Sequence, residues 1–299
     1  MKANKLLVLL LAICCVTMVG CKKESENGNN SENDSQAPKI VSTKETVLYL
    51  DDEGVVFGEY FEGEYLIIVE ALFDDDRMMY FAITSPSTAA VVDRQFFYGP
   101  DNEDFSFSEG YVYRGDVVVP SELEHLGETY SVTETWSFGG SVFVESVVFP
   151  NSLTSVGGCI NSSNLKSVTF GNSIVIIDKN SFYNCKRLTS VDFPNTLVEI
   201  RETAFYGTDL KAVTIPNSVK KIGYGAFTQN CELKSVTCLA VNPPELYLDD
   251  LDNLNHPIYT VLYYRFLSSP ETIRVPCQSV QAYKTADGWS QYADIIVGF

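Results

Sequence analysis

Few side chains in this chain are suited to catalysis. Only two of its 299 residues are histidines, His125 and His256, and neither lies in a recognisable catalytic motif. Acid–base and metal chemistry both rely heavily on histidine, so there is little material for a His-based metal site or for two acid–base centres. The GxSxG, HExxH and P-loop motifs are absent. Carboxylates alone can hydrolyse glycosides, and with 39 acidic residues this remains the one enzyme class left open.

Cysteines and acidic runs are the other candidates for metal or nucleophilic chemistry. Of the eight cysteines, Cys14, Cys15 and Cys21 precede residue 22, and the others are Cys159, Cys185, Cys231, Cys238 and Cys277. This second set is odd in number and contains no CxxC pair, which excludes a complete disulfide framework and a zinc ribbon. The acidic runs 51–53 and 74–76 lack the alternating spacing of an EF-hand loop and are interpreted as solvated turns. No metal, cofactor or catalytic residue is therefore predicted.

Charge is unevenly distributed along the chain. Lys and Arg together number 21 against 39 Asp and Glu, a net charge of −18, which disfavours binding to the phosphates of nucleic acids. Residues 44–109 hold 16 acids and 3 bases, whereas 151–240 hold 6 acids and 9 bases. An acidic N-terminal module thus precedes a mildly basic region.

The N-terminus is predicted to be a targeting signal. Lys2 and Lys5 precede an apolar run over 6–19, which is shorter than the ~20 residues of a membrane span and is typical of a secretory signal peptide over 1–20. The run ends in MVGC (18–21), which resembles a bacterial lipobox and implies lipid attachment at Cys21. The alternative is an ordinary signal peptide with an incidental cysteine.

The next segment, 21–43, is predicted to be a disordered linker because residues 22–39 contain a single apolar side chain, Ala37. Its opening, KKE (22–24), is similar to the charged export signals of Bacteroidetes surface lipoproteins. The expected location is therefore the outer membrane at the cell surface, with a lipid anchor as the only contact with the membrane.

A repeat occupies the middle of the chain. The segments FPNSLTSV (149–156), FGNSIVII (170–177), FPNTLVEI (193–200) and IPNSVKKI (215–222) align directly, with spacings of 21, 23 and 22 residues. Apolar residues recur three and six positions after the Pro or Gly, and each unit closes with a Leu and a Val three apart. An irregular first unit begins at Pro120, and its extra length over 124–130 is interpreted as a polar loop around Gly127. Cys185 and Cys231 fall where the repeat interior is expected, so both are predicted to be buried and unreactive.

These repeats resemble the BspA-like (Treponema pallidum-type) leucine-rich repeat family, which is common on the surfaces of Bacteroides and related bacteria. The resemblance is carried by IPNSVKKIGYGAFTQNCELKSV (215–236) and extends over 116–240, and IRVPCQSVQAYKTADGWSQYADII (273–296) resembles the segment that often follows such repeats. It implies surface lipoproteins linked to adhesion to host matrix proteins or other cells.

The pattern itself predicts a β-rich solenoid, in which segments such as LKSVTF form strands of one parallel sheet and their apolar anchors fill a continuous core. The predicted divisions are the signal peptide 1–20, the linker 21–43, a small β-rich module over 44–115, the repeats over 116–244 and a C-terminal cap over 245–299.

Alternation in the strands places two rows of small polar residues on the outer face of this sheet, with a lysine row beside them. The candidate binding residues are Lys166, Thr169, Asp192, Lys211, Thr214, Lys234 and Thr237. The alternative is a solvated face that binds no specific ligand.

The sequence therefore favours a non-enzymatic surface protein that binds an extracellular protein through its repeats. A second hypothesis places a carbohydrate site in the N-terminal module, which has 15 Tyr and Phe over 49–113. Exposed aromatic rings stack on sugars, so that module is the feature on which a glycan ligand depends.

Overall fold

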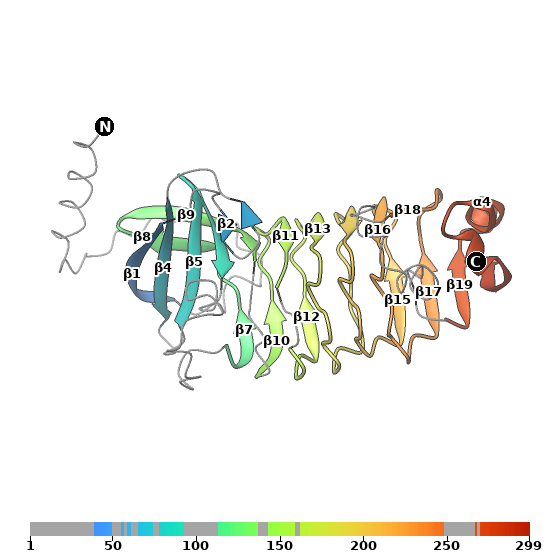
Figure 1. Ribbon diagram of the computed structural model, residues 1–299, viewed down its shortest axis with the longest axis horizontal. Coiled ribbons are helices and arrows are strands. Elements are labelled where there is room, and N and C mark those ends of the chain that lie inside the picture. The colour runs from blue at the N-terminus through green and yellow to red at the C-terminus, as the bar shows by residue number, and fades with distance from the viewer. Residues whose placement is uncertain are drawn as a thin grey trace, which may run out of the picture. The chain divides into compact units, whose positions relative to one another are not determined.

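The repeat units build two parallel sheets, whereas the sequence pattern predicts only one (Figure 1). Most repeats contribute a two- or three-residue strand to a larger sheet and a second short strand to a smaller one. All the elements that the structure describes belong to one compact unit, residues 33–299. The computed structural model describes residues 39–49, 55–56, 59–60, 65–73, 78–92, 113–136, 143–158, 162–247, 267 and 270–299.

The larger sheet contains 11 strands in the order β1-β4-β5-β6-β9-β11-β13-β14-β16-β18, with β8 paired to β9. Its strands are β1 (Ile40–Tyr49), β4 (Tyr65–Phe73), β5 (Met78–Ser85), β6 (Thr88–Val92), β8 (Glu122–His125), β9 (Glu128–Thr135), β11 (Ser155–Val156), β13 (Ile176–Ile177), β14 (Glu199–Ile200), β16 (Lys221–Gly223) and β18 (Glu245–Tyr247). A separate antiparallel pair joins β2 (Val55–Val56) to β3 (Glu59–Tyr60).

The register of the larger sheet follows the repeat in the sequence. Ser155 pairs with Ile176, Ile176 with Glu199 and Glu199 with Lys221, and all these pairings are parallel. Neighbouring partners are thus 21, 23 and 22 residues apart. In the repeats, β11, β13, β14 and β16 lie at the ends of the aligned segments, where a less buried residue precedes a buried Val or Ile.

The smaller sheet is divided into a three-stranded part, β12-β10-β7, and a four-stranded part, β15-β17-β19-β20. The strands are β7 (Gly115–Val118), β10 (Val144–Val148), β12 (Ser167–Thr169), β15 (Ala212–Ile215), β17 (Ser235–Cys238), β19 (Thr272–Val275) and β20 (Ile296–Gly298). The strand expected in RLTSVDF (187–193) is not formed. Lys211 N donates to Thr189 O over 3.3 Å, but no ladder continues from that bond, and the two parts of the sheet are separated at this turn.

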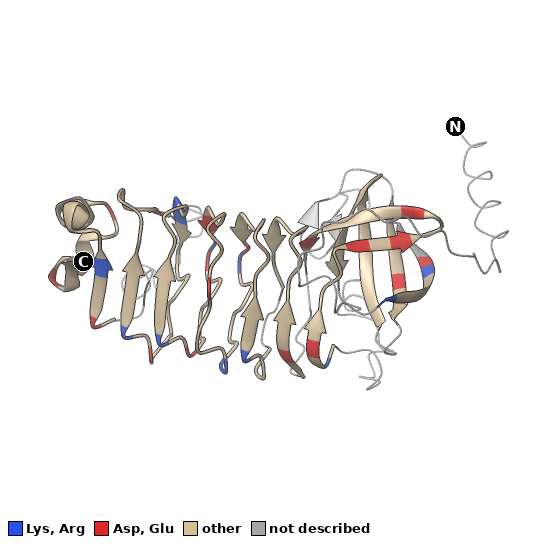
Figure 2. Cartoon of the chain, turned by 180° about the vertical axis from the view of Figure 1, so that it is seen from behind, with Lys and Arg blue, Asp and Glu red and all other residues tan. Residues whose placement is uncertain are grey.

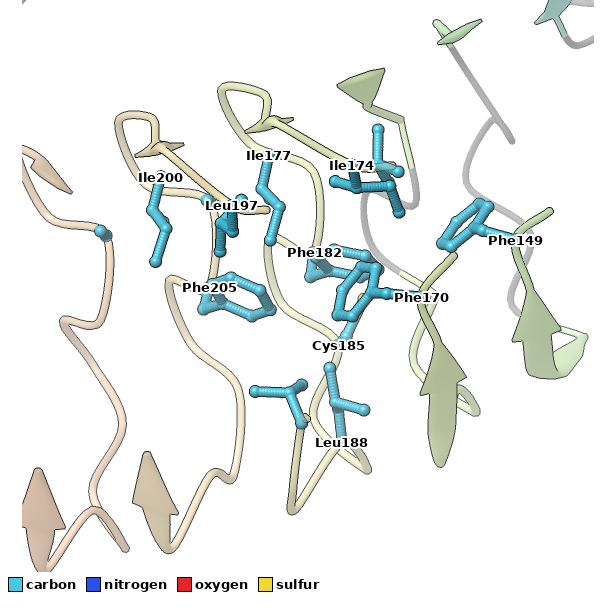
Figure 3. Close-up of a cluster of buried hydrophobic side chains, with 14 of the residues drawn as sticks. Phe149, Phe170, Ile174, Ile177, Phe182, Cys185, Leu188, Leu197, Ile200 and Phe205 are labelled. Carbon is cyan, nitrogen blue, oxygen red and sulfur yellow. The ribbon is translucent and has the colours of Figure 1, made fainter. Parts of the chain in front are cut away.

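A column of phenylalanines fills the interior between the two sheets (Figure 3). Phe182, Phe205 and Phe227 are fully buried, and their rings stack with centroid distances of 5.0 and 5.4 Å. Ile177 and Ile200 point toward this column from the larger sheet. Burying one such side chain contributes roughly 1.5–3 kcal/mol. No single repeat encloses these rings, so their burial stabilises only the stacked array.

The N-terminal strands continue the repeat sheet and do not form a detached module. β1, β4, β5 and β6 are antiparallel to one another, β6 then pairs in parallel with β9, and β9 pairs in parallel with β11. β1 begins at Ile40, inside the segment 21–43 that is expected to be a linker. Ile40 is half-buried against the core, and this contact holds the start of β1 in the sheet.

The residues expected to form a polar loop, 124–130, instead form part of a β-hairpin. β8 and β9 pair antiparallel around a two-residue turn, Leu126-Gly127, in which both residues have positive φ. This is the backbone of a type I′ turn, which matches the twist of the strands it joins. The sequence signal was hidden because leucine occupies the position where such turns usually have asparagine.

Both ladders extend into the segment assigned to the C-terminal cap. β18 pairs with β16 and β19 pairs with β17. The chain then folds through η3 (Cys277–Ser279), α4 (Val280–Thr285) and η4 (Ser290–Ile295) before β20. Tyr283 and Trp289 pack edge to face and cover the end of the core, and Trp289 Nε1 donates to Pro244 O over 2.7 Å. No helix in the described ranges is both long and apolar enough to cross a membrane.

Candidate binding surface

The outer face of the smaller sheet presents two rows of small polar side chains. The buried valines Val147, Val213 and Val236 alternate with outward residues on each side. One row is formed by Asp116, Ser146, Ser167, Ala212, Ser235 and Thr272, and the other by Val118, Val148, Thr169, Thr214, Thr237 and Arg274. Within each part of the sheet, parallel strands place equivalent residues about 4.8 Å apart, so most positions of the rows in the repeats present closely spaced hydroxyl groups.

The predicted threonines lie on strands of this face, whereas Asp192 lies outside any strand. Thr169 and Thr214 are exposed on β12 and β15, and Thr237 is half-buried on β17. Asp192 is exposed in the segment that forms no strand, between the two parts of the sheet. The backbone at Asp192 therefore lacks the strand pairing that holds the three threonines in register.

The three predicted lysines are not equivalent. Lys166 Nζ lies 2.5 Å from Glu145 Oε2, so its positive charge is already neutralised by a carboxylate on the neighbouring strand β10. Lys211 and Lys234 are exposed, and no described carboxylate lies within ion-pairing distance of either. Figure 2 shows basic and acidic residues interspersed along the repeats and mainly acidic residues on the N-terminal strands.

Sequence reasoning missed Arg274, which extends the second row. β19 pairs with β17, and this register places Arg274 beside Thr237. Its guanidinium carbon lies 5.8 Å from the centre of the exposed Phe299 ring. The alternating segment TIRV (272–275) indicates a strand. It follows Ser235 by many more residues than the 21 to 23 that separate the other repeats, so the repeat spacing does not point to it.

The larger sheet presents a different kind of face, whose charges are mutually paired. Arg201 Nη1 lies 2.5 Å from Asp178 Oδ1, and Tyr247 Oη donates to Glu199 over 2.6 Å. Burial of the Arg201 guanidinium acts to lower its pKa, but Asp178 and Glu199 outweigh this and raise it. Because these groups satisfy one another, this face has fewer charges available to a partner.

His125, in the β8–β9 hairpin, is buried and links the hairpin to β1. His125 is only 4% exposed, and its Nδ1 and Nε2 lie 2.9 Å from Thr43 Oγ1 and 3.1 Å from Glu45 Oε2. The described residues contain no group of three His, Cys, Asp or Glu side chains arranged to bind a metal ion. His256 and Cys21 lie outside the described residues.

One cysteine prediction is wrong. Cys185 is fully buried, and burial raises the pKa of its thiol to about 12. Cys231, also predicted to be buried, is exposed. The interior position is the third residue after the phenylalanine, which is Cys185 in one repeat and Asn230 in another, whereas Cys231 is the fourth. Asn230 Nδ2 donates instead to Phe205 O over 2.8 Å.

Comparison with known proteins identifies the repeats. A model of the BspA-type leucine-rich repeat region matches residues 124–234 in six copies. Residues 124–234 are a BspA-type leucine-rich repeat region. No curated protein matches the chain.

Several solved structures resemble it more loosely. A T. pallidum leucine-rich repeat protein is 25% identical with a TM-score of 0.43, covering 57% of this chain and 68% of that one. A Bacteroides ovatus leucine-rich repeat protein is 19% identical with a TM-score of 0.43, covering 67% and 58%. A leucine-rich cell surface protein from Faecalibacterium prausnitzii is 18% identical with a TM-score of 0.31, covering 56% and 54%. With scores this low, the assignment depends on the family model and the repeat register.

The BspA-type region is shorter than the ladders that contain it. The match begins inside β8 and ends one residue before β17. The pairing of β9 with β6 continues the larger sheet before it, and the pairing of β17 with β19 continues the smaller sheet after it. The candidate surface therefore includes Arg274, which lies beyond the residues that define the family.

Proposed function

We propose that the chain is a surface-exposed, lipid-anchored protein that binds an extracellular protein through the smaller sheet. Leucine-rich repeat solenoids generally act as extended binding surfaces. The observation that carries the proposal is the pair Lys211 and Lys234, which are exposed beside the hydroxyl rows with no described carboxylate in ion-pairing range. A partner with an acidic patch over a flat surface fits this arrangement. The resemblance to BspA-like proteins suggests host matrix proteins or other cells as the source.

The test compares two pairs of lysines that differ in their surroundings. The double variant Lys211→Gln/Lys234→Gln removes the two unmatched charges. Its matched control, Lys44→Gln/Lys221→Gln, removes the same charge from lysines of the larger sheet that pair with Glu70 and Glu245. The purified protein and both variants are applied to an array of host matrix proteins. The first variant is expected to bind a matrix ligand about tenfold more weakly, and the control to remain close to wild type.

Absence of matrix binding by the wild type, or equal losses in both variants, would contradict the proposal. Because exposed charges are screened over ~8 Å at physiological salt, binding is also expected to weaken as salt is added.

The carbohydrate hypothesis has less support. Within residues 44–115, the aromatic side chains that the structure describes, Phe73, Tyr80, Phe81 and Tyr113, are all buried. Tyr113 Oη donates to Val92 O over 3.0 Å, which fixes that ring inside the core. Described rings in this part of the chain are thus used for packing. A glycan array run beside the matrix array distinguishes the two ligands, since binding to glycans alone would favour a sugar site.

The anchor is a separate element of the proposal. Cleavage before Cys21 and lipid attachment at its thiol would hold the protein at the outer membrane. Replacement Cys21→Ala is expected to abolish labelling by radioactive palmitate and to release the protein from the membrane fraction or leave an unprocessed precursor. If the wild-type protein takes up no label, the anchor is refuted while the binding surface is unaffected.

A further inference from the structure

A hollow of about 390 Å³ lies at the N-terminal strands, away from the lysine-bearing face of the repeats. Residues 40–43 at the start of β1 form one wall, and residues 124–129 of the β8–β9 hairpin form the other. The hollow is partly open to solvent. A volume of this size accommodates a few side chains of an extended peptide.

Two strand edges meet at this hollow. Among the strands that the structure describes, β1 pairs only with β4, and β8 pairs only with β9. No backbone ladder joins β1 to β8, and the contact between them is made by His125 reaching Thr43 and Glu45. Alternate residues of an edge strand direct N–H and C=O groups away from the paired neighbour, which leaves donors and acceptors for an added extended chain.

Two apolar side chains flank the opening and contribute little to the core. Leu126 is 72% exposed and Val41 is 58% exposed. Leu126 also has a left-handed backbone, with φ of 52°, which is unfavourable for a leucine by about 1–2 kcal/mol. Asparagine or glycine at this turn position would avoid that cost, so folding alone does not explain why leucine is displayed there.

Unmatched acids give the opening its charge. Glu124 and Glu128 are exposed, and no described basic side chain lies within ion-pairing distance of either. Glu45, by contrast, is paired with His125. The charge that remains is negative, opposite to that of Lys211 and Lys234 on the repeats.

We propose that this hollow binds an extended, basic segment of a partner protein. The segment lies along the free strand edges, with an apolar side chain held between Val41 and Leu126 and lysine or arginine side chains opposite Glu124 and Glu128. The site is independent of the lysine-bearing face of the smaller sheet and prefers a partner of the opposite charge.

The probe is a fluorescent hexapeptide of alternating valine and lysine, and its counterpart has glutamate in place of lysine. The wild-type protein is expected to bind the first and not the second, with an affinity that falls as salt is added. Glu124→Gln/Glu128→Gln is expected to weaken binding about tenfold. Leu126→Asn removes the apolar contact but suits the left-handed backbone, so it should weaken binding while leaving the melting temperature unchanged or higher.

Glu271→Gln is the matched control, because it removes an exposed acid beside β19, outside the hollow. It is expected to bind the peptide like the wild type. Hydrogen exchange should slow at 40–43 and 122–129 when the peptide is added. The proposal is overturned if the wild type binds neither peptide or both alike. It is also overturned if Glu271→Gln weakens binding as much as the hollow variants, or if protection appears only elsewhere.

Discussion

Phe205 lies between Phe182 and Phe227, with ring planes inclined by 15° to the first and 3° to the second. All three rings are fully buried, and they come from three successive turns of the repeat. Phe205 also contacts Phe193 edge to face, with centroids 5.5 Å apart. A single side chain therefore joins the packing of neighbouring repeats.

Phe205→Ala is expected to lower the free energy of unfolding by ~3–5 kcal/mol, because it leaves a cavity lined by rings that cannot all collapse into it. Urea denaturation followed by circular dichroism measures the change. Thr214→Ala on the outward row is the control and should alter stability by less than ~0.5 kcal/mol. Equal effects of the two substitutions would show that the buried column does not dominate stability.

The interior of the repeats could be predicted from sequence because each anchor recurs at a fixed offset. Leu197, Ile200 and Phe205 follow Pro194 at intervals that the neighbouring units share, and all three are buried. The repeat strands of the larger sheet escaped detection because they are only two or three residues long, too short for an alternating pattern to be seen.

The candidate sites were harder to predict because they depend on pairing between distant residues. Lys166 resembles Lys211 in sequence, and only the structure reveals that Glu145 neutralises it. His125 meets Thr43 across 82 positions of sequence, a contact that no local spacing encodes. The turn at Leu126 and Gly127 was not predicted either, because leucine rarely adopts the left-handed backbone that this turn requires.

Thr203 is strained where its equivalents are not. It has φ of 51°, while the matching residues of the adjacent repeats are Asn180 and Gly225, with φ of 59° and 65°. A β-branched residue is disfavoured in this conformation, although Thr203 Oγ1 gains a hydrogen bond to Asn180 Oδ1. Thr203→Asn is expected to raise stability by about 1 kcal/mol. Gly225→Thr introduces the same strain and should lower the melting temperature, and the opposite order of melting temperatures would refute this account.

Gly171 is expected to be irreplaceable, even though proline occupies the same position in neighbouring repeats. A Cβ at Gly171 would lie 2.1 Å from the carbonyl oxygen of Pro150, and backbone atoms cannot rotate away. Gly171→Ala should therefore lower the free energy of unfolding by at least ~2–3 kcal/mol. Gly115→Ala, where no atom lies within 4 Å but φ is +63°, isolates the backbone penalty and should lose about 1 kcal/mol. A smaller loss of stability at Gly171 than at Gly115 would mean that the backbone at Gly171 can move away from Pro150 at little cost.

The buried thiol of Cys185 should make stability depend on pH. Burial raises its pKa from 9.0 to about 12, so between these values the unfolded chain has lost a proton that the folded chain retains. Because the folded state binds more protons in that window, its stability is intact below pH 9 and falls as the pH rises toward 12. The slope attributable to this thiol approaches ~1.4 kcal/mol per pH unit.

Cys185→Ser removes the titrating group while keeping a small polar side chain, as in the equivalent residues Ser162 and Thr208. The stability difference between wild type and variant, measured by urea denaturation at pH 8, 9, 10 and 11, isolates this contribution, because every other titrating group is common to both proteins. The wild type is expected to lose stability faster than the variant above pH 9, where the unfolded thiol ionises. Thiol labelling at pH 8 supplies an independent check: Cys231 and Cys277 are exposed and should react in the folded protein, whereas Cys185 should react only on unfolding. Parallel stability curves for the two proteins, or rapid labelling of Cys185 in the native state, would show that the interior admits solvent at this turn.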